Sequence, residues 1–242
     1  MIFKKKAICD PNEISDSEIR QQFAELKATA NAWIKDKTSD EQILILNYII
    51  DILTEDICSG SAAKVLYNSC SSPFKECIPC FYINERGEKN TIFAGKKINI
   101  DLANAKLYVC PWNKTRILNN LLNLAKKPFV FDETNHLSDF YTDIGLCHVY
   151  NGNHSIHAGS YFKKGNIISN ICCTELLYPH CSTDGLYWYN IHTGDEITKV
   201  ADFRIASLYA IAQLRYNIKS SSNMSHSINK KTERIPINYE KS

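Results

Sequence analysis

The sequence lacks any long apolar run. No segment reaches the roughly 18 uninterrupted apolar residues that a membrane-spanning helix needs. The N-terminal lysines are soon followed by Asp10, Glu13 and Asp16, where a secretory signal would carry its apolar stretch. We therefore expect a cytoplasmic protein with no membrane partner.

A strong excess of charge of either sign is also missing. The chain has 28 Lys and Arg against 26 Asp and Glu, a formal net charge of +2. This balance excludes a protein that binds nucleic acid or membrane through its overall charge, so any basic surface must be local. The 242 residues are 44% apolar, which predicts a buried core. The Lys-, Asn- and Ile-rich composition favours a bacterial or mobile-element origin.

Motifs of common metal sites are scarce. The C-x-x-C pair of Cys77 and Cys80 has no second pair at recognisable spacing, and no H-E-x-x-H occurs. His154 and His157 are three residues apart, whereas metal-binding helices usually carry histidines at i and i+4. Zinc at the C-x-x-C pair with Cys70, or a histidine site, stays a minor alternative, and no metal ligand is assigned. Most of the ten cysteines fit the role of small buried hydrophobes.

The two ends of the chain differ from its middle. Residues 1–60 predict a helical hairpin, whose first helix begins at a capping box of Ser15 and Glu18 and whose second ends at Ser59-Gly60. Such a hairpin suits a scaffold or oligomer surface, which makes a homodimer one expected partner. Residues 219–242 have a net charge of +3 and few large apolar side chains, which predicts a disordered polar tail.

Residues 61–218 mix strand and helix patterns and predict an α/β domain. Segment 153–165 lies between two strand patterns, which predicts a βαβ-type unit, and turn signals at 184–185 and 193–195 predict a hairpin. The other predicted elements are strands at 80–84, 98–100, 128–132, 145–152 and 166–177, and helices at 116–125 and 202–218.

The strongest candidate site is the stretch "HVYNGNHSIHAG" at 148–159. A strand that breaks at Asn151-Gly152 and re-enters as a helix near His154 directs free N–H groups and a helix dipole into the turn, which suits phosphate. Gly152 would allow a positive φ or close ligand approach, and Asn153, His154 and Ser155 could donate hydrogen bonds. The alternative reading makes these ordinary turn and cap residues.

Acid–base residues are less well defined. His154 is the candidate phosphate donor or general acid/base, and Asp184, before Gly185, is the preferred carboxylate for a nucleotide-bound Mg²⁺. Asn135-His136 is a further polar element that precedes the strand leading to the turn. The aromatic run at 185–190 could stack on a base, although a hairpin with Trp188 in the core accounts for it more simply.

Residues 98–177 resemble the ParB/sulfiredoxin superfamily, in which a strand ends in a glycine-led loop that opens a helix and binds nucleotide phosphate. The spacing of Pro111-Trp112 and Arg116, then Asn135-His136, then 151–156 and Asp184-Gly185 is similar to a bacterial family of unknown function, DUF6710. The resemblance implies an α+β fold: a mixed sheet with flanking helices, preceded by the helical hairpin. It also implies a phosphate or nucleotide site made by Asn151, Gly152, Asn153, His154, Ser155, Arg116 and His136.

The chain departs from the superfamily at the loop. Ser155 and His157 replace two arginines, so the phosphate clamp loses two fixed positive charges. Asn153 stands where sulfiredoxin-like proteins carry the reactive cysteine, and the remaining chain is too short for a helix-turn-helix region. Two functions stay open: a nucleotide hydrolase, phosphotransferase or nuclease with His154 and Asp184, or a non-catalytic nucleotide-sensing or DNA- or protein-binding module that dimerises through its N-terminal helices.

Overall fold

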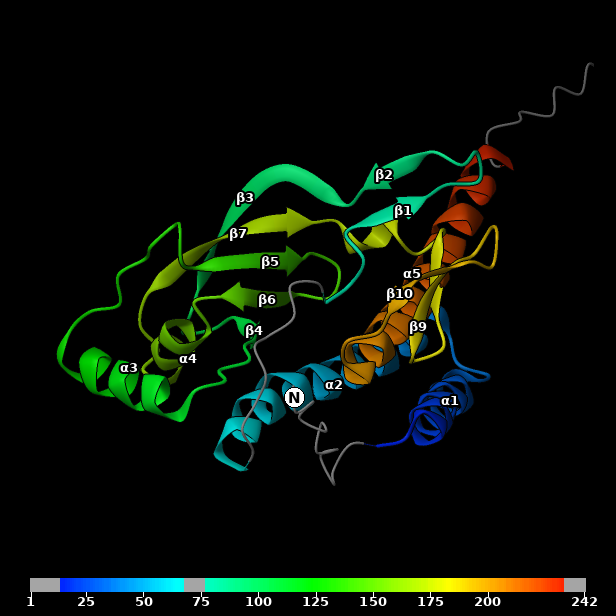
Figure 1. The fold of residues 1–242 in the computed structure, drawn as a ribbon. Coiled ribbons are helices and arrows are strands. Elements are labelled where there is room, and N and C mark those ends of the chain that lie inside the picture. The colour runs from blue at the N-terminus through cyan, green and yellow to red at the C-terminus, as the bar shows by residue number, and fades with distance from the viewer. Residues whose placement is uncertain (1–13, 68–76, 233–242) are drawn as a thin grey trace, which may run out of the picture.

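The two N-terminal helices and the C-terminal helix pack together beside the central sheet. The computed structural model describes residues 14–67 and 77–232. Helix α1 (Asp16–Ile34) begins at the predicted capping box, which confirms the roles of Ser15 and Glu18. It is followed by α2 (Ser39–Tyr67), and both pack against α5 (Phe203–Thr232) (Figure 1).

Helix α2 does not stop at Ser59-Gly60 as the sequence pattern predicts. The Ser59 hydroxyl donates to the Glu55 carbonyl within the helix at 2.7 Å, and the helix continues to Tyr67. Gly60 instead allows close approach of another side chain, because a Cβ there would lie 2.9 Å from Nη1 of Arg204. The predicted boundary at residue 60 therefore falls inside a helix.

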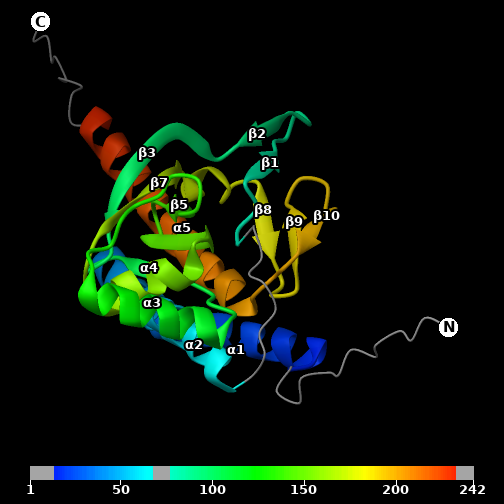
Figure 2. The same ribbon diagram turned by 60° about the vertical axis from the view of Figure 1, so that its left-hand side comes forward.

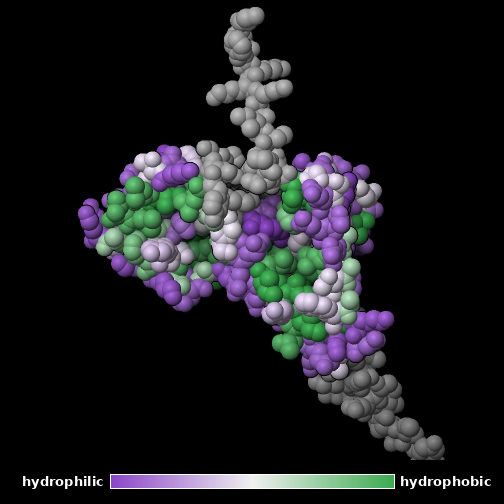
Figure 3. Space-filling model, turned by 90° about the horizontal axis from the view of Figure 1, so that it is seen from below, coloured by the Kyte–Doolittle hydropathy of each residue, from purple (hydrophilic) through white to green (hydrophobic). Residues whose placement is uncertain are grey.

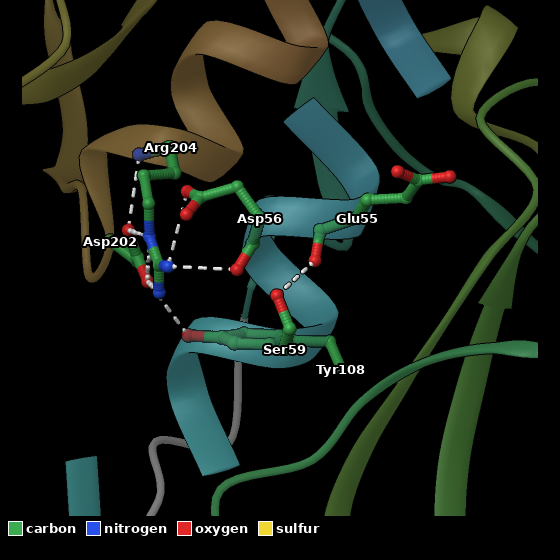
Figure 4. Close-up of polar contacts among 6 residues, drawn as sticks. All are labelled: Glu55, Asp56, Ser59, Tyr108, Asp202 and Arg204. Atoms are coloured by element: carbon green, nitrogen blue, oxygen red, sulfur yellow. Dashed lines mark hydrogen bonds and ion pairs between the residues drawn. The ribbon is translucent and has the colours of Figure 1, made fainter. Parts of the chain in front are cut away.

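Arg204 links α2 to the start of α5 and to the sheet (Figure 4). Its Nη2 donates to Asp202 at 2.6 Å, and its Nη1 donates to Asp56 at 3.3 Å. The hydroxyl of Tyr108, on β4 (Lys106–Tyr108), also donates to Asp202 at 3.1 Å. Burial opposes the charge of Arg204, but the hydrogen bonds and the charge of Asp202 outweigh burial and raise its pKa.

The central sheet is mixed, as predicted. Its order is β3-β7-β5-β6-β4, with β4·β6 and β5·β7 parallel and β3·β7 and β5·β6 antiparallel. Together with the helices, this confirms the α+β class. The other strands of the sheet are β3 (Phe93–Asp101), β5 (Leu137–Tyr141), β6 (Leu146–Asn151) and β7 (Asn166–Cys172).

The sequence predicts a strand at 128–132, but the strand in this part of the chain is β5, which begins at Leu137. Phe129 there stacks on His136, Phe131 contacts the same ring at a tilt, and both pack on the core, while the segment joins no sheet. Strand β5 lies between β6 and β7 and is antiparallel to β6 but parallel to β7, so β6 and β7 run antiparallel to each other. The predicted βαβ unit is therefore wrong, although its strand–helix–strand order is correct.

Each face of the sheet has its own hydrophobic core. Along β6, Cys147 and Val149 point to one face and Leu146 to the other. The first core lies beneath α3 (Lys114–Lys126) and α4 (Asn153–Tyr161), which lie side by side at one end of the molecule (Figures 1 and 2). The second core joins α1, α2 and α5 to the sheets, and it includes Phe23, Leu46, Tyr108, Trp188 and Tyr209. The N-terminal helices thus share a core with later elements.

A smaller sheet lies beside α5 (Figure 2). Strands β8 (Cys181–Thr183), β9 (Tyr187–Asn190) and β10 (Glu196–Lys199) pair antiparallel, which confirms the predicted hairpin and adds a third strand. A separate hairpin of β1 (Phe81–Ile83) and β2 (Lys89–Thr91), and a one-turn helix at Thr174–Leu176, complete the described elements.

Helix α5 is longer than the composition predicts. Disorder is expected from Lys219, yet the helix continues through Thr232, and residues 233–242 lie outside the described residues. The hydroxyls of Ser221 and Ser222 donate to the carbonyls one turn earlier at 2.9 and 3.0 Å, and adding residues to an existing helix costs little free energy. In the part of the chain that the structure describes, no helix is long and apolar enough to cross a membrane.

Candidate functional site

The predicted strand–glycine–helix turn is present. Strand β6 ends at Asn151, Gly152 adopts a left-handed conformation with φ +76°, and α4 begins at Asn153. The first helical hydrogen bond runs from Ile156 N–H to the Gly152 carbonyl at 3.0 Å. The turn therefore places the N-terminus of α4 at the end of a central strand, as the sequence predicts.

Gly152 is required by both its backbone and its neighbours. A Cβ there would lie 2.5 Å from Cδ2 of His136 and 2.9 Å from the Asn135 carbonyl oxygen. A positive φ is also disfavoured for residues with a side chain. Asn135 and His136 thus lie at the turn, as predicted, and cover part of it.

His136 and Ser155 hold the turn together. The Asp132 N–H donates to Nδ1 of His136 at 3.0 Å, and the Ser155 hydroxyl donates to the Gly152 carbonyl at 3.0 Å. The 2.9 Å contact between Nε2 of His136 and Oγ of Ser155 then assigns the histidine proton to Nε2. Burial lowers the pKa of His136, with the charge of Asp132 opposing. The hydrogen bonds of both side chains therefore stabilise the turn itself.

Asn153 is buried at the first position of α4, with 2% of its surface exposed. Its Oδ1 accepts from the Cys110 N–H at 2.7 Å, which ties the helix to the segment before α3. Its Nδ2 is buried and has no acceptor among the described residues. A buried donor without an acceptor is costly, and a ligand oxygen would satisfy it.

His154 also connects the two helices. Its Nε2 accepts from the N–H groups of Asn113 at 3.1 Å and Trp112 at 3.3 Å, so this nitrogen carries no proton. Burial is the main cause of its lowered pKa, and the charges of Arg116 and His157 contribute. The histidine is therefore neutral, and Nε2 cannot serve as a general acid.

Arg116 lies in the first turn of α3, beside this end of α4. Its guanidinium lies over the Trp112 ring, 5.0 Å from the centroid, and the same ring packs edge-on against His154 at 5.1 Å. The side chain is exposed and makes no ion pair with any carboxylate of the described residues. Of the predicted site residues, Asn151, Asn153, His154, Ser155, His136 and Arg116 thus gather around Gly152.

Asp184 does not belong to this group. It lies in the turn between β8 and β9, on the opposite side of the molecule from α4 (Figures 1 and 2). Its carboxylate accepts from the N–H groups of Leu186 and Tyr187 at 2.9 and 2.8 Å and from Nε of Arg20 at 3.2 Å. The predicted pairing of His154 with Asp184 is therefore not formed, because Asp184 organises a hairpin turn and anchors α1.

The free groups at the turn are hydrogen-bond donors. The N–H groups of Asn153, His154 and Ser155 have no acceptor among the described residues, and no side chain caps the helix. Unpaired N–H groups and the helix dipole favour an anion. The Asn153 amide and the Arg116 guanidinium add donors of the same kind.

Two hollows of the described structure lie away from the turn. One hollow of about 750 Å³ is lined by residues of the small sheet and α5, including Tyr189 and Gln213. A second of about 520 Å³ lies between the start of α2 and α5. Neither hollow includes a residue of the Gly152 turn.

No metal cluster is found within residues 14–67 and 77–232, where no three His, Cys, Asp or Glu side chains come together to hold an ion. In the C-x-x-C pair, Cys77 is buried, and burial raises its pKa well above the ordinary thiol value. Cys70, the other cysteine considered for zinc, lies outside the described residues.

Sequence reasoning missed the contacts made by the segment before α3. Its backbone N–H groups at Cys110, Trp112 and Asn113 bind the side chains of Asn153 and His154. The signal available was the "CPWN" stretch, in which Asn113 caps α3 through the Arg116 N–H. It also missed a local excess of exposed lysines on α3 and in the turns that follow α3 and α4.

Comparisons with known proteins give one match. The model of a family of unknown function, DUF6710, matches residues 8–222. No curated protein and no solved structure matches the chain.

Proposed function

This chain belongs to the DUF6710 family, and we propose that it binds a phosphate group of a nucleotide or nucleic acid at the N-terminus of α4. The observation that carries this proposal is the set of unpaired donors there: three backbone N–H groups, the buried amide of Asn153 and the guanidinium of Arg116. Phosphate oxygens are acceptors and carry negative charge, so they suit every one of these groups.

A relationship to the ParB/sulfiredoxin superfamily is part of the same proposal. The mixed sheet, the glycine turn at the end of β6 and the helix that follows agree with that fold. Fold likeness alone assigns no activity, so the function rests on the turn.

We propose binding without catalysis. Nε2 of His154 is engaged by two N–H groups, and Asp184 lies elsewhere. The donors at the turn do not fit a resident Mg²⁺, because N–H groups and a guanidinium repel a cation. Mg²⁺ therefore enters this proposal only as a companion of a bound nucleoside di- or triphosphate.

The test is a titration of ¹⁵N-labelled protein with inorganic phosphate and with nucleoside mono-, di- and triphosphates. We expect the amide signals of Asn153, His154 and Ser155 to shift. Arg116→Gln should weaken binding about tenfold through loss of a charge-assisted hydrogen bond. Arg86→Gln is the matched control, because Arg86 is exposed in the β1–β2 turn.

Two results would contradict the proposal. Unchanged amide signals at millimolar phosphate and nucleotide would remove the site. Phosphate release in the presence of Mg²⁺ that disappears in His154→Ala would restore the enzyme in place of the binding module.

We also propose that the protein forms a homodimer through its N-terminal helices. Leu44, Tyr48 and Ile52 lie one turn apart on α2 and are exposed by 69%, 58% and 48%. Figure 3 shows a hydrophobic area on this underside of the molecule. Light scattering should give a dimer mass for the wild type and a monomer mass for Tyr48→Glu, with Leu122→Glu on α3 as the control. A monomer at every wild-type concentration contradicts a dimer.

A further inference from the structure

We infer that the face formed by α3 and α4 binds single-stranded nucleic acid, with the phosphate site at the Gly152 turn as one end of a longer track. This inference rests on the proposed phosphate site and names its ligand class. It starts from the distribution of charge, which is close to balanced over the whole chain but not on this face.

The sequence of α3, of α4 and of the residues just after each helix carries cations and no carboxylate. The carboxylates beside this face are Asp101, which pairs with Asn166 on β7, and Asp132, which contacts His136 at the Gly152 turn. From residue 102 to 131, and again from 153 to 166, the sequence has no Asp or Glu. The exposed basic residues of α3, α4 and the turns that follow them are Lys114, Arg116, Lys126, Lys127, Lys163 and Lys164. None of them forms an ion pair within the described residues.

Two pairs of these lysines lie close together at the far end of the face. Phe129, just after α3, would touch a Cβ placed at Gly159 or Gly165, so the chain after α3 lies beside the chain after α4. This arrangement brings Lys126 and Lys127 near Lys163 and Lys164. The dipoles of both helices favour a cation at their C-termini, but four lysines at one end of the face repel one another. Asp101, which pairs with Asn166, accepts hydrogen bonds from Ala103 and Asn104 and forms no ion pair with these lysines. A polyanion on this face would relieve that repulsion.

The length of the face indicates a chain of several nucleotides. Ten residues of α3 separate Arg116, beside the Gly152 turn, from Lys126, which corresponds to roughly 15 Å at 1.5 Å per residue. One phosphate at the turn cannot also contact the lysines at the other end. Successive phosphates of one strand can contact both.

Tyr161 indicates a single strand. It is the last residue of α4, is 71% exposed and stands next to Lys163 and Lys164. An exposed ring beside cations is a stacking platform for a base, and only an unpaired base offers its face to such a ring. Leu118 and Leu122 on α3 are both 55% exposed, and Figure 3 shows a hydrophobic area with hydrophilic surroundings at its left, at the end of the molecule where α3 lies. They add apolar contact area for bases.

The experiment measures the fluorescence anisotropy of a labelled 12-nucleotide single strand with the full chain over a range of salt concentrations. We expect affinity to fall steeply with salt, with a logarithmic slope of roughly −0.7 per phosphate contact. The variant with Lys126, Lys127, Lys163 and Lys164 all changed to Gln should bind at least tenfold more weakly and show a shallower slope. A matched variant with Lys35, Lys37, Lys96 and Lys199 changed to Gln removes the same charge from exposed lysines elsewhere and should bind as the wild type does.

Stacking is tested at Tyr161. Tyr161→Ser should weaken binding roughly tenfold, and Tyr161→Phe should keep it, because the phenylalanine ring stacks as well. Duplex of the same sequence should bind more weakly than the single strand. Equal affinity for duplex, together with no effect of Tyr161→Ser, would overturn the single-strand assignment.

Failure of this inference is distinguishable from failure of the phosphate site. Amide shifts at Asn153–Ser155 with inorganic phosphate, combined with equal oligonucleotide affinity of the two lysine variants, overturn the inference and leave the phosphate site standing. Binding to anionic lipid vesicles or to polyglutamate, but not to the oligonucleotide, also overturns it. Absence of both phosphate and oligonucleotide binding overturns the inference and the proposed function together.

Discussion

At the scale of single residues, Gly152 decides whether the turn can form. We expect Gly152→Ala to lower the free energy of unfolding by about 2 kcal/mol or more, because a methyl group would meet His136 and would hold a positive φ. Gly194→Ala is the control: its φ is also +76°, but nothing lies within 4 Å, so it should cost only about 1 kcal/mol. Urea denaturation of both variants gives the comparison. Equal losses would contradict a steric role for His136.

His136 also makes the stability of the turn depend on pH. Burial lowers its pKa in the folded protein, while in the unfolded chain it titrates near 6.5. As pH falls, His136 therefore takes up a proton in the unfolded chain before it does so in the folded protein. The contribution of neutral His136 to stability is fully present above pH 6.5 and is lost as pH falls below it. Burial lowers the pKa of His148, on β6, to about 4, which acts in the same direction.

Denaturation at pH 8, 7, 6 and 5 measures this effect. We expect a stable plateau above pH 7 and a loss of stability below pH 6.5 in the wild type. His136→Gln should have a shallower loss, because one of the depressed groups is gone. An identical pH profile for wild type and variant would show that His136 does not contribute.

At the scale of elements, His154 positions α3 and α4 relative to each other. His154→Leu leaves the N–H groups of Trp112 and Asn113 without their acceptor, and we expect a loss of about 2 kcal/mol. His154→Gln keeps an acceptor oxygen and should lose less. Phosphate affinity of the Gln variant should stay near that of the wild type. A large loss of affinity with unchanged stability would instead place His154 on the ligand.

The elements that could be predicted from the sequence are those with strong local signals. The Ser15–Glu18 capping box and the Asn151-Gly152 break each determine where a helix begins, and both are confirmed. Strand β5 was missed because Ser138 and Asp139 are buried within it and interrupt its apolar pattern. The hydrogen bond from Asn170 to Asp139 that accommodates this carboxylate comes from β7, so no local pattern reveals it.

The candidate site was predictable to the same extent. Residues close in sequence to Gly152 lie where expected, and Asn135-His136 and Arg116 join them. Asp184 could not be placed, because an Asp-Gly turn signal says nothing of which side of the molecule the turn occupies. Its partner Arg20 is 164 residues away in sequence.

At the scale of the whole molecule, the N-terminal helices and the sheets should unfold together. One buried cluster contains Phe23 and Leu46 from the N-terminal helices, Tyr108 from the central sheet and Trp188 from the small sheet. A shared core of this kind leaves no boundary at which one part could remain folded alone. Arg204 adds a polar link across the same junction, since it contacts α2 through Asp56 and its partner Asp202 contacts β4 through Tyr108.

Loss of this link should destabilise the entire chain. We expect Arg204→Met to lower the free energy of unfolding by about 3 kcal/mol, because Asp202, whose side chain is 11% exposed, would keep a buried charge without its arginine. Adding Asp202→Asn should recover part of the loss, since asparagine is neutral and still caps the start of α5. Arg20→Met breaks the exposed pair with Asp184 and should cost much less than Arg204→Met, because solvent screens an exposed pair. Circular dichroism and tryptophan fluorescence should report one coincident unfolding transition in every variant. Separate transitions in Arg204→Met would show that the junction depends on this ion cluster rather than on the shared core.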